Sequence, residues 1–320
     1  STELFLIIVV FIYYVLATLL PIDKLIGRIY PVFGFALIFM ALGIVLMMFV
    51  NKYPMQELDL TALTNNLHSS AEKFPVFPMM FVTIACGAIS GFHATQSPLM
   101  ARCMQNEKNG RPVFFGAMIT EGIVALIWAA IAMSFFGGVR ELNETMTSLG
   151  GNAAKVVNDV ANQLLGPIGA VLALLGVVAA PITSGDTAFR SARLIIADIF
   201  HFSQVKLKNR LFISVPMFGV GLLLTFVNFD IIWRYMAWMN QTLAMVTLWA
   251  ITAYMLQAKK PIWMSLLPAV FMTTVSMVYI LIAPEGLALN KNLAYLIGGI
   301  LTLIIVFSFF VFVRKKSKTN

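Results

Sequence analysis

Residues 87–102 read GAISGFHATQSPLMAR, and they close an apolar stretch that begins after Pro75. A histidine, a glutamine, a proline and several glycine and hydroxyl residues stand where a lipid-facing helix would be uniformly apolar. In lipid, an unpaired backbone group is costly, so such an interruption persists only where protein or a water-filled cavity satisfies it. The stretch therefore predicts a broken membrane helix, whose free ends can bind anions through amides and cations through carbonyls.

The composition is that of a membrane protein. Hydrophobic residues make up 60% of the 320 residues and charged residues only 11%, and the mean hydropathy is +0.88. A soluble domain has more than twice that charged fraction. Apolar runs of about 20 residues, enough to cross a bilayer, recur along the chain. They predict an all-α polytopic protein with nine transmembrane helices, at 3–22, 29–50, 76–93, 112–137, 167–185, 211–227, 231–256, 262–283 and 293–313.

The distribution of charge predicts the orientation. Of the 22 basic residues, sixteen fall in one set of alternate segments: Lys24, Arg28, Arg102, Lys108, Arg111, Arg190, Arg193, Lys206, Lys208, Arg210, Lys259, Lys260, Arg314, Lys315, Lys316 and Lys318. The opposite set holds Lys52, Lys73, Arg140, Lys155, Arg234 and Lys291. The positive-inside rule places the first set, and the C-terminus, in the cytoplasm. The net charge of +8 is thereby explained by topology, and no nucleic-acid partner is needed.

The same topology places Ser1 outside, although residue 3 already enters a span and neither an initiator Met nor a signal peptide precedes it. We therefore expect an odd number of further helices before this chain. The alternative is a nine-helix protein with a processed start.

The residues around the predicted break are candidate substrate ligands. Ser90, Thr95, Gln96 and the amides around Gly91 offer hydrogen-bond donors to an anionic group. Small residues also allow helices to pack closely, so the stretch has a purely structural interpretation as well.

A second stretch, APITSGDTAFRSAR at 180–193, has a similar design. Ser184, Gly185, Ala188 and Ser191 repeat the small residues of the first stretch at an offset of 94 residues. Transporters often place paired interrupted helices around a central site, so both stretches are predicted to line one. The hydroxyl cluster Thr183, Ser184 and Thr187 is a candidate for a coupling ion or the substrate. Chance sharing of packing residues is the alternative.

Glu121 is the one acid well inside an apolar span, and no basic residue stands within a turn or two of it in sequence. An intramembrane carboxyl must face protein or water, and burial disfavours its charged form. We predict that Glu121 carries the coupling proton, with His93 as a relay. Asp186 is a weaker candidate because Arg190 at i+4 offers it a partner. A structural hydrogen bond between helices is the alternative role for Glu121.

Other features of the sequence give less information on function. Residues 154–165 predict an amphipathic helix along the outer surface, and 186–200 predict either an extension of the fifth span or a helix at the inner face. Cys86 and Cys103 imply no disulfide framework, and with His93 they fit no familiar metal-ligand spacing. We therefore predict no metal and no cofactor.

Four motifs carry a resemblance to a known family: YYVLATLLPIDKLIGRIYP at 13–31, FHATQSPLMARC at 92–103, NGRPVFFGAMITEGIVALIWAAIAMSFFGG at 109–138 and SGDTAFRSARLIIAD at 184–198. Together they closely resemble the carbon starvation protein A (CstA) family of bacterial inner-membrane transporters, over most of residues 5–210. The resemblance implies uptake of peptides or pyruvate, with proton coupling. It also implies a fold like that of the amino acid–polyamine–organocation transporters, with five-helix inverted repeats.

In that fold, 76–93 would be the broken helix of the second repeat, and 167–185 the helix that often supplies hydroxyl ligands. Further helices precede the first motif in this family, in agreement with the expectation for the N-terminus. The whole chain, 1–320, is then expected to be a single transporter domain, with 76–210 forming the site and 211–320 adding C-terminal helices. Its partners are a small-molecule substrate, protons and the lipid bilayer.

Two other classes of function stay open. A channel would use the same broken helices without an occluded state, and a nutrient sensor would need a signalling domain that these residues lack. An enzyme is not expected, because the three histidines lie far apart and neither a Gly-x-Ser-x-Gly nor a His-x-x-x-His motif occurs.

Overall fold

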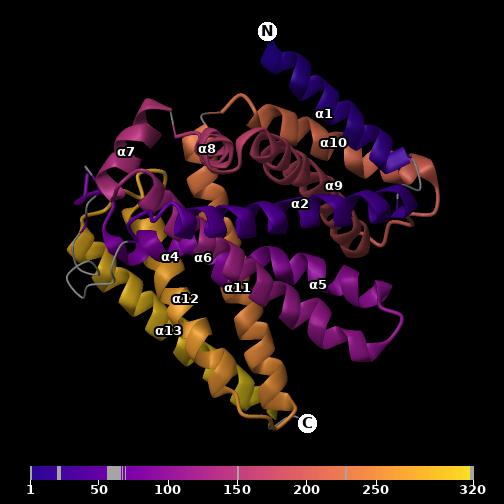
Figure 1. The fold of residues 1–320 in the computed structure, drawn as a ribbon. Helices are drawn as coiled ribbons and strands as arrows, with labels where there is room; N and C mark the ends of the chain where they lie inside the picture. Colours follow the sequence, from indigo (N-terminus) through magenta and orange to yellow (C-terminus); the bar gives the residue numbers. More distant parts are fainter. Residues whose placement is uncertain are drawn as a thin grey trace. The chain divides into compact units, whose positions relative to one another are not determined.

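The computed structural model describes residues 2–19, 23–55, 66, 68, 70–149, 151–227 and 229–317 (Figure 1). These residues form helices joined by turns and loops, and none of them lies in a β-strand. The chain divides into two compact units, each drawn from two separate stretches. The first comprises Ser1–Glu57 and Ile123–Asn228, and the second Leu58–Gly122 and Phe229–Asn320.

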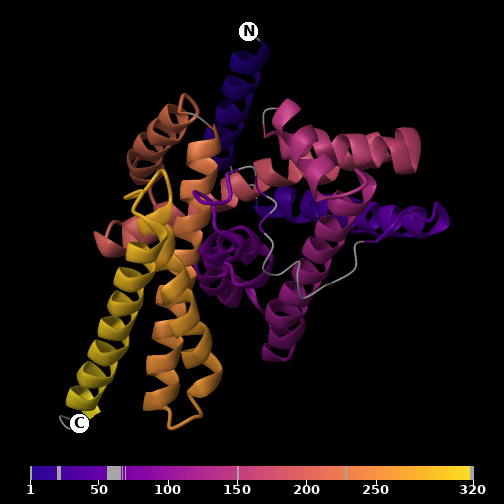
Figure 2. The same cartoon turned by 90° about the vertical axis from the view of Figure 1, so that its left-hand side faces the viewer.

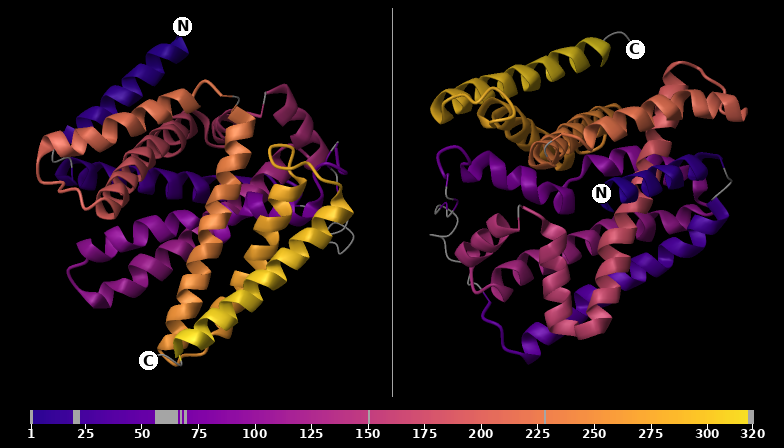
Figure 3. Two further views of the ribbon diagram at one scale, coloured as in Figure 1. Left: turned by 180° about the vertical axis from the view of Figure 1, so that it is seen from behind. Right: turned by 90° about the horizontal axis from the view of Figure 1, so that it is seen from above.

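The first unit is built from α1 (Thr2–Leu19), α2 (Asp23–Val50), α7 (Val139–Ser148), α8 (Ala153–Ala173), the π-helix η3 (Leu174–Ala179), α9 (Ala180–Ile199) and α10 (Leu207–Leu224), with most of α6 (Ala117–Phe135) (Figure 3). Its core lies where α2 packs against α8, with Met40 and Ile44 against Val160 and Ala161 and with Ile131 of α6 beside them. This core holds the middle of the unit together by burial of apolar side chains.

The second unit combines α4 (Val76–Ala88) and α5 (Gly91–Cys103) with three long helices, α11 (Phe229–Gln257), α12 (Trp263–Ile282) and α13 (Lys291–Ser317). Figure 2 shows α12 between α11 and α13. Hydrogen bonds tie α11 to α12: the Trp249 indole donates to Thr273 Oγ1 at 2.9 Å, and the Thr252 hydroxyl donates to Ser265 Oγ at 2.9 Å. Such polar contacts fix helix pairs where lipid supplies little hydrophobic drive.

Six described helices are long and apolar enough to cross a membrane: Pro31–Val50, Glu107–Phe135, Ala153–Val177, Leu207–Leu224, Trp263–Ile282 and Lys291–Phe312. The bent pair Val76–Ile84 and Cys86–Cys103 makes a seventh if it is one span. The polytopic, all-helical class is thus confirmed, whereas the predicted count of nine is not. Helices do occupy the other two predicted places, but α11 carries the amides Asn240 and Gln241, and the apolar part of α1, Phe5–Ala17, is short.

The region 153–199 differs from the prediction. The expected surface helix 154–165 and the start of the expected fifth span form one candidate span, because α8 continues past a kink at Gly166 (φ 61°) and Pro167. The apolar face of 154–165 is buried in the core of the first unit at Val156, Val160, Ala161 and Leu164. Further on, η3 leads directly into α9, so 186–200 extends the preceding helix, one of the two expected alternatives.

Candidate functional site

The predicted interruption lies at Ile89 and Ser90. The helix α4 ends at Ala88 and α5 begins at Gly91. The 46° bend of this candidate span lies a few residues earlier, between Val76–Ile84 and Cys86–Cys103. Ser90 has extended backbone (φ −96°, ψ 129°), and its hydroxyl accepts from the Phe92 amide at 3.3 Å. Serine is among the residues that best cap a helix N-terminus in this way. The polar stretch after the break, 91–103, is therefore helical.

A residue from a distant part of the sequence completes this cap. Asn240 of α11 accepts from the Phe92 amide through Oδ1 at 2.9 Å, and its Nδ2 donates to Ser90 Oγ at 3.2 Å. Protein groups thus satisfy part of the backbone that the break exposes, as membrane depth demands. The Phe92 amide, one of the donors expected to be available around Gly91, is engaged by Asn240.

Gly91 is where α5 meets α11 most closely. A Cβ at this position would overlap the Asn240 carbonyl oxygen and lie 2.7 Å from Leu243 Cβ and 3.0 Å from the Ala244 nitrogen. Two of these three atoms belong to backbone, which cannot move aside without shifting a helix. The glycine is therefore required by the packing of the break itself.

Gln241, beside Asn240, is a further candidate residue that the sequence pattern was not used to predict. It is 0% exposed, and both its amide nitrogen and its amide oxygen lack a hydrogen-bond partner among the described residues. Ala244 and Met245 follow it by three and four residues and share its face of α11. Ala244 lies against Gly91, and Met245 belongs to a buried cluster against which Ile89 packs. Helix periodicity thus puts Gln241 on the face of α11 that meets the break. The signal for it was available as two adjacent amides inside an apolar run.

His93 and Glu121 are brought together. His93 stands in the first turn of α5, and its Nε2 lies 2.7 Å from Glu121 Oε2, with the two side chains 32% and 39% exposed. Glu121 precedes Gly122, where a Cβ would lie 3.5 Å from the Gly87 carbonyl oxygen, so the start of α6 runs against the end of α4. The side-chain partner that Glu121 lacks along its own helix is thus supplied by His93 of α5. The second ring nitrogen, His93 Nδ1, is buried and has no hydrogen-bond partner among the described residues.

Thr95 and Gln96 lie on α5 beyond His93 and are partly buried. The Thr95 hydroxyl donates to the Phe92 carbonyl at 2.9 Å, and Gln96 Nε2 donates to Thr95 Oγ1 at 3.3 Å. Of the substrate candidates, Ser90 and Gly91 therefore stand at the break itself, and Thr95 and Gln96 stand one turn further along.

The second predicted stretch is organised differently. Ser184, Asp186 and Thr187 lie inside the continuous helix α9 of the first unit, and the irregularity is the π-helix before it. The side chain of Thr183 is outside the described residues. Asp186 is 5% exposed, and Arg190 Nη2 lies 3.3 Å from its Oδ2, which is the pairing that the i+4 spacing suggested.

Gly185 in this stretch serves close packing. A Cβ there would overlap the hydroxyl of Tyr14 on α1, and the Tyr14 ring packs against Phe189 and Phe218. Part of the small-residue pattern at 184–191 is therefore explained by the approach of α1.

Within the part of the chain that the structure describes, no three His, Cys, Asp or Glu side chains gather in a way that could hold a metal ion. The helices and the broken span define a multi-pass helical membrane protein. Residues 1–170, more than half of the chain, match the family model described as "Carbon starvation protein CstA". The chain belongs to this family.

Individual relatives agree with this assignment. A membrane protein of Haemophilus influenzae is 43% identical over 154 residues, which are 44% of this chain and 41% of that protein. The pyruvate/proton symporter BtsT of Escherichia coli is 35% identical over 122 residues, 37% of this chain and 14% of the symporter. The peptide transporter CstA of Campylobacter jejuni is 34% identical over 89 residues, 27% of this chain and 13% of the transporter. The matched part is thus less than half of each relative, and no solved structure matches the chain.

Proposed function

We propose that this protein is a secondary transporter that imports a small organic nutrient with a carboxylate group, a peptide or pyruvate, across the bacterial inner membrane together with protons. The observation that carries the proposal is the His93–Glu121 pair, held next to a broken helix in a member of the CstA family. The relatives named as a pyruvate/proton symporter and as peptide transporters support the substrate class. The fold we propose is the inverted-repeat fold that the resemblance implies.

The pair is suited to carrying one proton. With Glu121 ionised, neutral His93 can donate an Nε2–H to the carboxylate, and one added proton converts the pair to an imidazolium–carboxylate or to a carboxylic acid beside neutral imidazole. Every one of these states leaves His93 Nδ1 without a partner, at a cost of roughly 1–3 kcal/mol for a buried polar group. A substrate carboxylate that accepts from Nδ1–H would remove this cost, and it would bind best to the protonated pair.

This arrangement would couple binding of the proton to binding of the substrate carboxylate. If the carboxylate prefers the protonated pair, the proton must equally strengthen binding of the carboxylate, because the coupling of two binding events is reciprocal. In the structure Nδ1 is buried, so we propose that the substrate reaches it when the break opens. Ser90, Thr95, Gln96, Asn240 and Gln241 are the remaining donors that would hold the substrate there.

For the first unit by itself, we propose that the hydroxyl cluster Thr183, Ser184 and Thr187 binds a coupling ion or the substrate. Asp186 is paired with Arg190, which makes it less suited than Glu121 to take up and release a proton.

The test measures two activities in the same vesicles containing the purified protein. Accumulation of labelled pyruvate or dipeptide is driven by a pH gradient, and counterflow exchange is measured without one. We expect Glu121→Gln to lose accumulation and keep exchange, because the amide preserves shape and hydrogen bonding but cannot titrate. His93→Gln should give a milder loss, and Glu141→Gln, at an exposed acid of α7, serves as the matched control.

Gradient-driven accumulation by Glu121→Gln at the level of the control would remove this residue as the coupling site and leave it a structural hydrogen bond. The same vesicles address the alternative functions. Wild-type flux that does not saturate and ignores the pH gradient would indicate a channel, and absence of flux of either solute would favour a sensor.

A further inference from the structure

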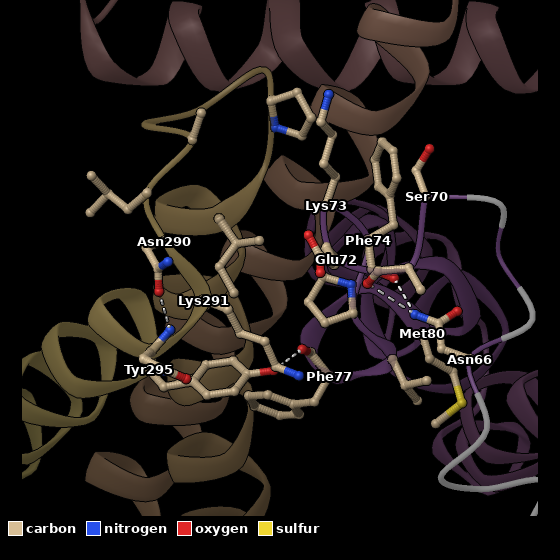
Figure 4. A pocket seen from close by; sticks show the side chains of 18 of the residues that line it. Asn66, Ser70, Glu72, Lys73, Phe74, Phe77, Met80, Asn290, Lys291 and Tyr295 are labelled. Carbon is tan, nitrogen blue, oxygen red and sulfur yellow. Dashed lines mark hydrogen bonds between the residues drawn. The ribbon is translucent and has the colours of Figure 1, made fainter.

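A second site in the same unit lies away from the break. An open cavity of about 1440 Å³ is lined by the loop residues 66 and 70–75, the starts of α4, α11 and α13, and the segment that follows α12. Figure 4 shows Asn290, Lys291 and Tyr295 on one side, with Phe77 beside Tyr295, and Asn66, Ser70, Phe74 and Met80 on the other. Because α13 begins here and runs 27 residues to Ser317, about 40 Å of helix separates the cavity from the C-terminal tail.

The lining of this cavity is basic. Lys73, Arg234 and Lys291 line it, and among the described lining residues Glu72 is the one acid. These three are half of the six basic residues that the charge distribution assigns to the outer side. The positive-inside rule describes a shortage of basic residues on the outer side, so the presence of three of them at one cavity requires an explanation.

The neighbouring acid Glu285 balances the charge of Arg234 but not the charges of Lys73 and Lys291. It is buried, with its side chain 2% exposed, and it accepts from the Tyr279 hydroxyl at 2.6 Å and from Arg234 Nε at 3.2 Å. Its contact is with Nε alone, and the Arg234 guanidinium carbon lies 5.9 Å from the Phe74 ring centre. Lys73 and Lys291 are exposed, and no ion pair joins either to a carboxylate of the described residues.

One helix end adds to the positive potential. Helix α13 begins at Lys291, which lines the cavity, so the positive end of its dipole lies beside it. The Tyr295 hydroxyl of this helix donates to the Phe77 carbonyl at 2.7 Å, where the backbone at the start of α4 is not helical (φ −96°, ψ 127°). The cavity thus combines two lysine side chains with partial positive charge from the backbone.

We propose that this cavity is a capture site for a small organic carboxylate, on the membrane face opposite the C-terminal tail, with Lys73 and Lys291 as its principal ligands. A basic cleft with apolar walls concentrates anions and raises their association rate. Phe74, Phe77 and Tyr295 would cover the organic part of the ligand. The contribution to uptake rests on the proposed function, whereas binding of the anion does not.

The test measures binding directly. Pyruvate is titrated into the purified protein in a neutral detergent at low and high salt, for wild type, Lys73→Gln, Lys291→Gln and the double variant. Arg140→Gln is the matched control, because Arg140 is exposed, is assigned to the same side and lines no described cavity. We expect each lysine variant to weaken binding about three- to tenfold, as for loss of one charge-assisted hydrogen bond. High salt should weaken the wild type and leave the double variant nearly unchanged.

Equal affinity of the double variant and Arg140→Gln would overturn the proposal. Much tighter binding of glycerol phosphate than of pyruvate would also overturn it, because the site would then hold a lipid headgroup. Equal binding of pyruvamide and pyruvate would overturn it as well. Transport is judged separately: lysine-dependent binding without any pyruvate or dipeptide flux would keep the capture site and reject the transporter. Pyruvate or dipeptide flux whose KM is unchanged in the double variant would keep the transporter and reject the capture site.

Discussion

Gly91 shows how one missing side chain sets the geometry of the break. The Asn240 carbonyl, the Leu243 side chain and the Ala244 nitrogen all approach the place that a Cβ would occupy. The same α11 segment supplies the amide that caps α5, so the distance between the two helices and the hydrogen bond to Phe92 depend on each other. A larger residue at 91 would strain both at once.

Gly91→Ala should therefore destabilise the protein by about 1–3 kcal/mol, the usual cost of inserting a methyl group where neighbours cannot relax. Gly299→Ala is the control, because nothing lies within 4 Å of a Cβ at that helical position of α13; there alanine should be neutral or slightly stabilising. Thermal unfolding of both variants in detergent makes the comparison. If Gly91→Ala unfolds at the same temperature as Gly299→Ala, α5 and α11 are not packed this closely in the membrane.

At the scale of the element, the sequence was sufficient to locate the break but not to complete it. Gly, Pro and hydroxyl residues gathered near Ser90 predict an interruption because few alternatives satisfy a backbone in lipid. The capping of α5 by Asn240 could not be predicted, since a contact across 148 residues depends on how α11 packs. The His93–Glu121 pair was foreseeable, because two isolated polar side chains at membrane depth require partners.

Asn240 allows capping to be separated from substrate binding. Asn240→Asp keeps an acceptor for the Phe92 amide, and a negative charge at a helix N-terminus is itself favourable by about 0.3–1 kcal/mol. If a substrate carboxylate enters the break, the added charge should weaken its binding at least about tenfold, since nearby like charges repel strongly at partly buried sites. Asn240→Ala removes the acceptor and should lower stability by about 1 kcal/mol, with a smaller effect on affinity.

Both Asn240 variants are compared by thermal unfolding and by titration with pyruvate or a dipeptide. An aspartate variant that folds normally and binds the carboxylate as well as wild type does would place the substrate elsewhere and leave the break as a packing device.

For the whole molecule, periodicity and length predicted the helical membrane class, because an uninterrupted run of about 20 apolar residues is typical of a membrane-spanning helix. They were less able to count spans. In α11, the amides that form the candidate site reduce the apolar signal, and in α8 a kink at Gly166 divides what the structure joins. Polar residues of a candidate site lower the hydropathy of the helices that carry them, so the helices nearest the site are the hardest to count from sequence.

Orientation depends on charge rather than on span counting, and it can be tested independently. The positive-inside rule assigns Lys208, at the start of α10, to the cytoplasm and Asn143, on α7, to the outside. Both side chains are exposed, so a cysteine at either place should react with a maleimide without disturbing a core. The native thiols, Cys86 and Cys103, are first replaced by serine to remove the background. In intact cells an impermeant maleimide should label Asn143→Cys and spare Lys208→Cys, and inverted vesicles should give the opposite result. Labelling of both positions from one side would invalidate the layout, and with it the placement of the Lys73–Lys291 cavity on the outer face.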